Sequence, residues 1–337
     1  MPPMLSSTIN QTKKGALMKA IVHERYGPPD VLQLKEIEKP SPEDDEVLVK
    51  VRVASVNAAD SHLMRGTPFL MRLMGFGFLK PKNKILGYDI AGRVEAVGRH
   101  VKQFKPDDEV FGNVTGGFAE YVRARENALA LKPTNTAFEE AAAVPLASVT
   151  ALQGLRDKGK IQPGQKVLIN GASGGVGTFA VQIAKSFGAE VTAVCSTRNL
   201  DLACSLGADH VIDYTKTDFT KNRERYDLIL AANGYHWISD YKRALAPKGT
   251  YVMTGGSMAQ FYQAMLLGPW MSMRGSKKMA NLMAKFNQKD LDFMKELLQE
   301  GKVKPVIDRR YPLSEVAGAI RYLEEGHALG KIVITVE

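Results

Sequence analysis

Cysteine is scarce in this sequence of 337 residues, which contains only Cys195 and Cys204. This pair builds neither a disulfide framework nor a four-thiolate zinc site, so the composition is typical of a reducing compartment and predicts a cytoplasmic location. The sequence also has no apolar run of about 18 residues, and it therefore predicts no membrane span. Residues 1–17 are polar and lack the apolar stretch of a signal peptide, so we expect them to form a disordered extension.

Acidic residues are in the minority: 36 of them stand against 45 lysines and arginines, which gives a net charge of +9. The basic residues are scattered along the chain, and no local basic face is combined with base-stacking aromatic side chains. We therefore do not expect nucleic acid as a partner. A positive field of this kind instead favours a small anionic ligand.

The most informative segment is a glycine-rich turn that follows an apolar run. Val167 to Ile169 reads as a buried strand, Gly171 begins a G-x-x-G-x-x-G pattern, and a helix-compatible segment covers 178–187. A strand, turn and helix in this order present the helix N-terminus to a pyrophosphate, and residues without a Cβ let the backbone approach it. A glycine-rich turn without a ligand is the alternative interpretation. The dinucleotide hypothesis selects Ser173, Gly174, Gly175, Val176 and Gly177.

The next strand, expected over 190–195, indicates which dinucleotide binds. NAD sites usually place a carboxylate at the end of this strand, to bind the ribose 2′-hydroxyl. Here Ser196, Thr197 and Arg198 stand at that point, and they offer two hydroxyls, a guanidinium and no carboxylate. This set suits a 2′-phosphate, so the sequence predicts NADP(H) as the cofactor. The alternative is that Arg198 is a solvated loop residue.

Two kinds of pattern divide the chain. Residues 18 to about 132 read mainly as strands with a period near two and with turn signals between them. From Pro145 onward strands and helices alternate, which predicts a doubly wound parallel sheet. Expected strands cover 167–169, 191–195, 211–213, 227–231 and 250–254. After a helix over 290–301, the strand pattern returns, and we expect the tail to rejoin the first half.

Several segments, taken together and in this order, give the chain a family resemblance. It resembles the zinc-free medium-chain dehydrogenase/reductases, close to the NADPH:quinone oxidoreductases. The matching segments, spread nearly from end to end, are 18–20, 26–27, 56–60, 87–92, 117–121, 145–152, 171–177, 207–214 and 330–332.

The resemblance implies an α/β fold class: a GroES-like β-rich catalytic domain at 18–143 and 288–337, and a Rossmann NADP-binding domain with a doubly wound parallel sheet at 144–287. It also implies a cleft between the two domains, and a homodimer formed by pairing of sheet edges. It adds Tyr214, Asn233 and Lys331 to the cofactor-binding residues.

The sequence departs from zinc-dependent relatives at their ligand positions. Those relatives carry a cysteine near Ala58 or Ala59 and a His-Glu pair where this chain has Tyr88 and Asp89. The lobe with four zinc-binding cysteines is also missing. Because catalytic zinc needs thiolate, imidazole or carboxylate ligands, we expect no metal. Zinc-type alcohol oxidation is then disfavoured. A short-chain dehydrogenase is excluded as well, because no tyrosine is followed by lysine four residues later.

Hydride transfer without a metal needs a substrate that is already electrophilic, such as a quinone or an α,β-unsaturated carbonyl. The resemblance places Asn57 and Thr150 near the nicotinamide, and Asn57 is alternatively only the cap of a helix over 58–65. His62 stands where related quinone reductases carry a tyrosine, and an imidazole suits proton delivery. The alternative is an ordinary helix histidine. We predict Asn57, His62 and Thr150 as catalytic residues.

Two further functions stay open at this point. One is an alcohol or ketone dehydrogenase of the same superfamily, and the other is a cofactor-binding interaction protein with affinity for nucleic acid. Two apolar segments, 67–79 and 261–273, have no assigned role. The first is followed by Lys80, Lys82 and Lys84. Each segment fits a substrate lid, ordinary core packing or a dimer surface, and contact with a membrane surface ranks below these.

Overall fold

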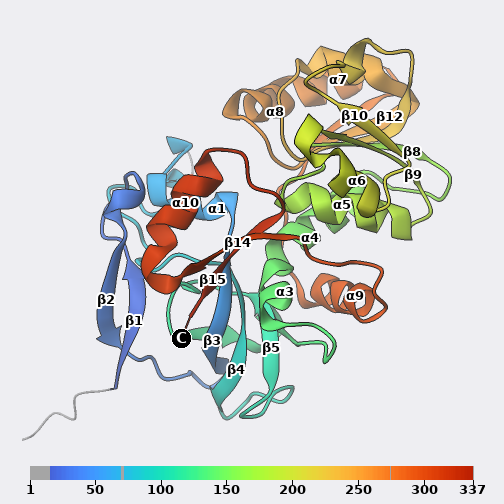
Figure 1. Ribbon diagram of the computed structural model, residues 1–337. Coiled ribbons are helices and arrows are strands. Elements are labelled where there is room, and N and C mark those ends of the chain that lie inside the picture. The colour runs from blue at the N-terminus through green and yellow to red at the C-terminus, as the bar shows by residue number, and fades with distance from the viewer. Residues whose placement is uncertain (1–15, 70–71, 274, 337) are drawn as a thin grey trace, which may run out of the picture.

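The computed structural model describes residues 16–69, 72–273 and 275–336 and forms two lobes (Figure 1). Most of the predicted N-terminal extension lies outside these residues, and the first strand begins at Leu17. One lobe combines the first part of the chain with its last part, and the other is built from the middle. This arrangement confirms the predicted fold class, whereas the domain boundaries given above stay a prediction.

The lobe formed by the chain ends, hereafter the catalytic lobe, contains a seven-stranded sheet. Six of its strands follow the order β14-β15-β3-β4-β5-β7, and the seventh, β6, also pairs with β3. A separate hairpin packs beside it. The strands are β1 Leu17–Val22, β2 Gln33–Glu38, β3 Glu46–Val56, β4 Asp89–Val97, β5 Glu109–Asn113, β6 Tyr121–Arg125, β7 Leu129–Leu131, β14 Ile307–Pro312 and β15 Lys331–Thr335. The helices and turns are η1 Pro29–Val31, α1 Ala58–Arg65, η2 Arg72–Phe76, η3 Glu126–Ala128, α3 Phe138–Ala143, α9 Gln288–Gln299, η7 Leu313–Glu315 and α10 Val316–Glu324.

The second lobe, hereafter the nucleotide lobe, holds a six-stranded parallel sheet in the order β10-β9-β8-β11-β12-β13. The strands are β8 Lys166–Asn170, β9 Glu190–Cys195, β10 His210–Asp213, β11 Tyr226–Ala231, β12 Leu245–Met253 and β13 Lys278–Asn281. The helices and turns are α4 Pro145–Leu152, η4 Gln153–Lys158, α5 Gly175–Ser186, η5 Thr197–Asn199, α6 Leu200–Ser205, η6 Phe219–Lys221, α7 Ile238–Ala244 and α8 Met258–Met273.

The strand order explains where a ligand can bind. Counted along this lobe, the order is 3-2-1-4-5-6, which is the order of dinucleotide-binding sheets. Successive strands are added toward one edge of the sheet from β8 to β10 and toward the other edge from β11 to β13. The loops after β8 and β11 therefore diverge and leave a crevice. All five strands predicted for this sheet are present. The sixth, β13, was not predicted.

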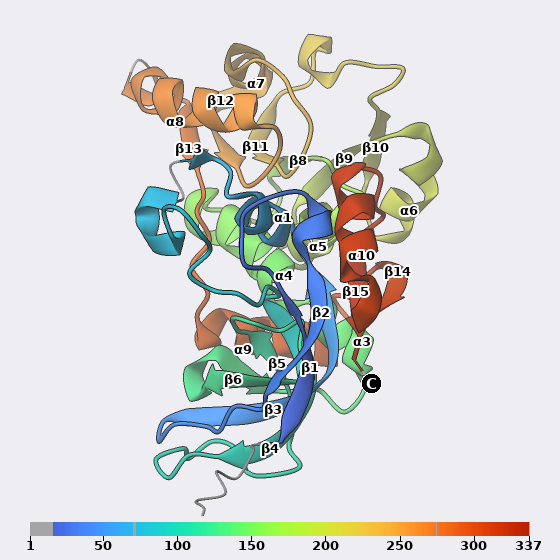
Figure 2. The ribbon, with the colours of Figure 1, turned by 90° about the vertical axis from the view of Figure 1, so that its left-hand side faces the viewer.

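Alternation along the parallel strands gives the sheet two buried faces. Val167 and Ile169 of β8 pack in one core with α4, α5 and α9, while Leu168 between them packs in another core with α7 and α8. The first core continues into the catalytic lobe, where it includes Val53 and Val333. The two lobes therefore share one apolar core. Figure 2 shows α4 between the two sheets.

The glycine-rich turn generates a prediction about stability. A Cβ built on Gly177 would lie 2.0 Å from the backbone oxygen of Gly171, so the Gly177→Ala variant must displace backbone. Overpacking of this kind costs about 1–3 kcal/mol, and we expect a clearly lower melting temperature.

The Gly174→Ala variant is the matched control. A Cβ there has its nearest neighbour at 3.6 Å, which is an ordinary contact. Thermal unfolding of both variants, followed by circular dichroism, tests the difference. Equal stability of the two variants would contradict the close packing of α5 on the turn.

Candidate active site

A cavity of about 490 Å³ lies at the point where the order of the parallel sheet reverses. Asn170, the last residue of β8, lines its floor together with the glycine-rich turn. Residues 326–328 of the catalytic lobe line it from the other side, so both lobes form the cavity. The other lining residues are Cys195, Ser196, Arg198, Asn199, Tyr214, Thr217, Asp218, Phe219, Asn233, Gly234, Tyr235 and His236.

A backbone contact fixes the two lobes to each other beside this cavity. The Gly330 N–H donates to the Ser173 carbonyl oxygen at 2.9 Å, and Gly174 and Gly330 form a parallel β-bridge. Gly330 has a positive φ of 76°, and a Cβ there would lie 2.3 Å from the Val306 carbonyl oxygen. Only glycine fits this close approach. The residue that precedes β15 therefore binds the glycine-rich turn directly.

The structure brings together about half of the predicted cofactor-binding residues. Ser173, Gly174, Ser196, Arg198, Tyr214 and Asn233 all line the cavity. Gly175, Val176 and Gly177 form the first turn of α5 behind it. Thr197 and Lys331 are not among the lining residues. Sequence reasoning missed Asn170, Asn199 and residues 326–328, although an asparagine directly before the glycine-rich turn was a visible signal.

The cavity fits a dinucleotide on two observations. The N-terminus of α5 opens toward the turn, and a Cβ on Gly174 would meet no atom closer than 3.6 Å, so the backbone there is accessible. Asn199 is buried, and its Nδ2 donates to Ser173 Oγ at 2.9 Å, while its Oδ1 has no hydrogen-bond partner. A buried acceptor without a donor is rare, and a ligand hydroxyl in this cavity would satisfy it.

The neighbouring strand adds a carboxylate near the end of β9. Residues 196–198 offer none themselves, but Thr197 Oγ1 donates to Asp213 Oδ2 at 2.5 Å. Parallel pairing of β9 with β10 sets Asp213 opposite Cys195 and so brings it there. The hydroxyls of Thr197 and Thr215 hold the pKa of Asp213 at about 2, so it is a carboxylate. Arg198 itself is exposed and donates to the His327 carbonyl oxygen at 3.2 Å.

Asp89 is the centre of a buried polar cluster that the sequence did not reveal. Its Oδ2 accepts from Asn57 Nδ2 at 3.0 Å and from Ser55 Oγ at 3.3 Å. Its Oδ1 accepts from Asn113 Nδ2 at 2.9 Å and from the Leu146 N–H at 3.0 Å. A carboxylate with this many donors is fully satisfied although it has no exposed surface. Asp89 thereby joins β3, β4, β5 and the start of α4.

Lys331 completes the cluster from the other end of the chain. Its Nζ donates to Asn57 Oδ1 at 2.5 Å and lies 3.5 Å from Asp89 Oδ2. Burial lowers the pKa of Lys331, while Asp89 and Asp60 act in the opposite direction. Burial also raises the pKa of Asp60 to about 7, although the N–H groups of Asn57 and Gly87 donate to it. The ammonium is therefore the positive charge that balances two buried carboxyls.

Asn57 and His62 belong to α1 and its N-cap position, Thr150 lies on α4, and their catalytic roles stay predictions. Asn57 stands at the N-cap position of α1, but its side chain makes no capping hydrogen bond and belongs to the Asp89 cluster. Thr150 is buried on α4, and its hydroxyl donates to the Leu146 carbonyl oxygen at 2.7 Å. His62 is half-buried on α1. Burial lowers its pKa below 6.5, and Glu324 of α10 partly opposes this shift.

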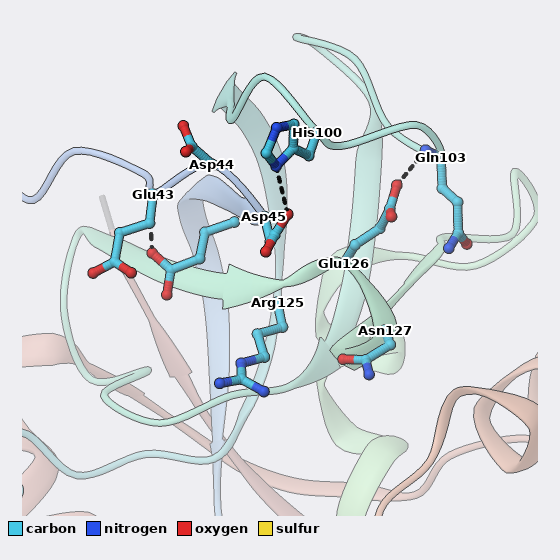
Figure 3. Close-up of a pocket in the computed structure, with 9 residues that line it drawn as sticks. Glu43, Asp44, Asp45, His100, Gln103, Arg125, Glu126 and Asn127 are labelled. Atoms are coloured by element: carbon cyan, nitrogen blue, oxygen red, sulfur yellow. Dashed lines mark hydrogen bonds and ion pairs between the residues drawn. The ribbon is translucent and has the colours of Figure 1, made fainter.

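A larger hollow of about 800 Å³ lies elsewhere on the catalytic lobe (Figure 3). Its lining is mainly acidic and includes Glu43, Asp44, Asp45 and Glu126. It lies where β3 begins, whereas Asn57 follows the end of that strand, so about 30 Å of extended chain separate the two places. Asp45 bonds to His100 at 3.1 Å there, and the Glu126 carboxylate accepts from the backbone. These contacts occupy the side chains locally and do not connect the hollow to the cluster.

Comparison with known proteins gives a consistent result. Residues 43–134 match the family model described as alcohol dehydrogenase GroES-like domain, and residues 206–334 match the one described as zinc-binding dehydrogenase. The 2-methylene-furan-3-one reductase of Solanum lycopersicum is 37% identical over 94% of this chain and 79% of its own length. The chloroplastic quinone-oxidoreductase QR1 of Triphysaria versicolor is 36% identical over 95% of this chain and 99% of its own length. The quinone oxidoreductase from Coxiella burnetii superposes with a TM-score of 0.85 at 30% identity, covering 96% of this chain and all of that one.

The chain belongs to the quinone-oxidoreductase-like, zinc-free branch of the medium-chain dehydrogenase/reductase superfamily. It is thus an oxidoreductase of a family that uses a nicotinamide cofactor. The model described as zinc-binding begins at residue 206, after the positions where zinc-dependent members carry their catalytic ligands. Within the described ranges, no three His, Cys, Asp or Glu side chains gather in a way that could hold a metal ion. No helix in those ranges is long and apolar enough to cross a membrane.

The buried cluster of this reductase generates a prediction about pH. The Lys331→Met variant removes the ammonium and leaves Asp89 and Asp60 without a balancing charge, which we expect to cost about 3–5 kcal/mol. The pKa of Asp60, which burial already raises to about 7, then rises further above its unfolded value. Stability falls as the pH rises toward such a raised pKa, so the loss of melting temperature is larger at about pH 8 than at about pH 5.

The control for this measurement is the Lys302→Met variant, which removes an exposed lysine paired with Glu300. It should change the melting temperature little at either pH. The same loss at both pH values in the Lys331→Met variant would show that the ammonium does not balance the buried carboxyls.

Proposed function

We propose that this protein is an NADPH-dependent, zinc-independent reductase that transfers hydride to a quinone or an α,β-unsaturated carbonyl. The observation that carries the proposal is the cavity between the lobes, which the glycine-rich turn and Arg198 line. A Cβ on Gly175 of that turn would lie 3.2 Å from Lys331 of the Asn57–Asp89–Lys331 cluster. The names of the relatives point to the same chemistry. They include a 2-methylene-furan-3-one reductase, quinone oxidoreductases and an NADPH-dependent alkenal/one oxidoreductase.

The proposed roles on the cofactor side follow from position. The N–H groups at the start of α5 face the pyrophosphate, Asn199 accepts a ligand hydroxyl, and Arg198 with Ser196 binds the 2′-phosphate. Thr197 is held by Asp213 and acts on Arg198 only through the local backbone. When bound, the reduced nicotinamide supplies a hydride for the electrophilic carbon of the substrate.

Asn57 is proposed as a donor to the substrate oxygen or to the carboxamide of the cofactor. One amide hydrogen is taken by Asp89 at 3.0 Å, whereas the contact to the Ser55 carbonyl oxygen is long at 3.4 Å. The hydrogen of that long contact is the one available to a ligand. Lys331, whose ammonium holds Asn57 Oδ1, keeps the amide in this orientation and makes its hydrogens more acidic. Lys331 is therefore proposed as a positioning residue for Asn57.

His62 is proposed to supply the proton after the hydride has moved. A proton donor must be protonated, and the lowered pKa of His62 makes the neutral imidazole the main form at pH 7. Glu324, bound by Arg65 at 2.6 Å, keeps some negative charge near the ring. This arrangement favours a reaction with an enone that is fastest on the acid side of neutrality.

Two finer predictions remain proposals. The homodimer would use β13, which is the edge of the described parallel sheet and has an unpaired side. The cytoplasmic location is supported only by composition. Several relatives are named as chloroplastic and others as mitochondrial, so the location of this protein needs its own measurement.

The cofactor preference depends on Arg198. The Arg198→Asp variant replaces an attractive charge with a repulsive one, so we expect NADPH to bind about tenfold to a hundredfold more weakly. NADH affinity should change little. The Arg223→Asp variant, an exposed change on the same lobe outside the cavity lining, is the control. Fluorescence titration with both cofactors is the measurement. An equal effect on both cofactors, or on neither, would mean that Arg198 does not read the 2′-phosphate.

The activity is tested with a panel of quinones, enones, enals and secondary alcohols, followed by NADPH absorbance. We expect turnover of quinones or enones and none with alcohols. For enones, the rate should fall as the pH rises through the His62 pKa, below pH 6.5. The His62→Ala variant should lose about a hundredfold in kcat and this pH dependence, with NADPH affinity kept. Quinones should be less affected, because a reduced quinone takes its proton from water.

Two results would count against these proposals. Turnover of alcohols alone would replace the reductase with a dehydrogenase. Equal enone rates for the wild type and the His62→Ala variant would leave His62 a structural residue and transfer proton delivery to solvent.

A further inference from the structure

The net positive charge of this protein is concentrated in two segments. Residues 61–88 contain five lysines and arginines, residues 241–289 contain eight, and neither segment contains an aspartate or glutamate. The rest of the chain holds all 36 acidic residues and only 32 basic ones, so it is net acidic. The basic residues themselves are scattered, with 32 of the 45 outside these segments, but the absence of acidic residues makes these two segments the net positive part of the chain.

The same two segments hold most of the exposed large apolar side chains of the described residues. Twelve of the eighteen such side chains lie in them, among them Leu79 at 85% exposure and Leu266 at 67%. The others are Phe69, Leu73, Phe76, Phe78, Tyr262, Met265, Leu267, Trp270, Met273 and Met283. Exposed apolar residues gathered in this way mark an interaction surface rather than the ordinary scatter of a monomer.

Helix α8 shows the pattern most clearly. It contains no charged residue in its sixteen positions. Tyr262, Leu266, Trp270 and Met273 recur at helical spacing and are all exposed, whereas Ala264 and Met271 face the core beside α7. The helix therefore has one apolar face against the protein and a second apolar face outside it. Lys278, which is exposed, lies five residues after the helix, whereas the half-buried Lys277 donates to the Lys242 carbonyl oxygen at 2.8 Å.

The two segments lie on one flank of the molecule. The light-blue segment around η2 and the orange helix α8 occupy the same side in both ribbon views, one on each lobe (Figures 1 and 2). Lys80, Lys82 and Lys84 follow η2, are exposed, and form no ion pair within the described ranges. Glu24, whose pKa is lowered mainly by Lys35 and further by the charge of Lys84, is paired with Lys35 at 3.1 Å.

We propose that this flank, formed by Phe69, residues 72–84, α8 and the exposed Lys278, docks on an anionic lipid surface. Aliphatic and aromatic side chains would enter the region between headgroups and acyl chains, and the flanking lysines would bind the negative headgroups. Tyr262 and Trp270 suit this boundary, because their rings are apolar with one polar atom.

Charge argues against two other occupants. A twofold contact through α8 and residues 72–84 would bring their exposed lysines together, which costs energy, whereas the homodimer proposed above pairs the edges of β13. A nucleic acid also carries negative charge and stacks on aromatic faces, of which this flank exposes five. Its most exposed side chains, however, are Leu79, Met273 and Leu266, which stack poorly and insert well into acyl chains.

The test is sedimentation of the full chain with vesicles. We expect binding to phosphatidylcholine vesicles with about 30% phosphatidylglycerol and little binding to phosphatidylcholine alone. Binding should weaken as salt rises from about 0.1 M to about 0.5 M, because the headgroup attraction is screened. The double variants Leu266→Glu with Met273→Glu, and Lys80→Glu with Lys82→Glu, should each reduce partitioning about tenfold or more.

The control is the double variant Leu34→Glu with Lys102→Glu, which makes the same kinds of change at exposed positions outside this flank. It should bind vesicles as the wild type does. Circular dichroism and light scattering of every variant show whether it is folded and whether its mass has changed, independently of any reductase activity.

Three results would overturn the proposal. The first is no binding to anionic vesicles at low salt. The second is a dimer that the Leu266→Glu and Met273→Glu changes convert to a folded monomer, with vesicle binding absent throughout, which assigns the flank to a second copy. The third is preferential capture of a single-stranded oligonucleotide that vesicles do not displace.

Discussion

The buried contact of Lys331 with Asn57 and Asp89 is the interaction on which the rest of the structure depends. It joins a residue near the end of the chain to residues of its first third, across 2.5 Å and 3.5 Å. None of the three side chains can be removed alone without leaving a buried polar group unpaired. The cluster therefore fixes the positions of Asn57, the start of α4 and β15 relative to one another. These parts form a single cooperative unit.

That unit also explains why the two lobes meet as they do. Gly330, next to Lys331, donates to Ser173 in the glycine-rich turn, and a Cβ on Gly175 would lie 3.2 Å from the Lys331 side chain. The apolar core of α4 and α5 runs on into the catalytic lobe. A ligand in the cavity therefore contacts backbone whose position is set by both lobes. Relative movement of the lobes would have to break this contact, so the site is built in advance of binding.

Local sequence signals predicted the elements but not the contacts between them. Helix α1 was predicted because Asn57 is a typical cap residue, and β8 with its turn is a continuous local pattern. Strand β13 was missed because it is four residues long and begins with lysine. The roles of Asp89 and Asp213 depend on strand register, which sets Asp89 opposite Ser55 and Asp213 opposite Cys195. No spacing along the chain encodes those neighbours.

The position of β15 has a consequence for how the protein is made. Ile332 to Thr335 pair with β3 on one side and β14 on the other, so a strand synthesised last fills the gap beside one synthesised early (Figure 1). Until then, residues 53–56 of β3 lack this partner while the whole nucleotide lobe emerges, which at ordinary elongation rates takes roughly 10–50 s, although β6 already pairs with residues 46–50. The nucleotide lobe has its own sheet and can fold first. The nascent catalytic lobe is therefore a natural client for a chaperone that shields unpaired strand edges.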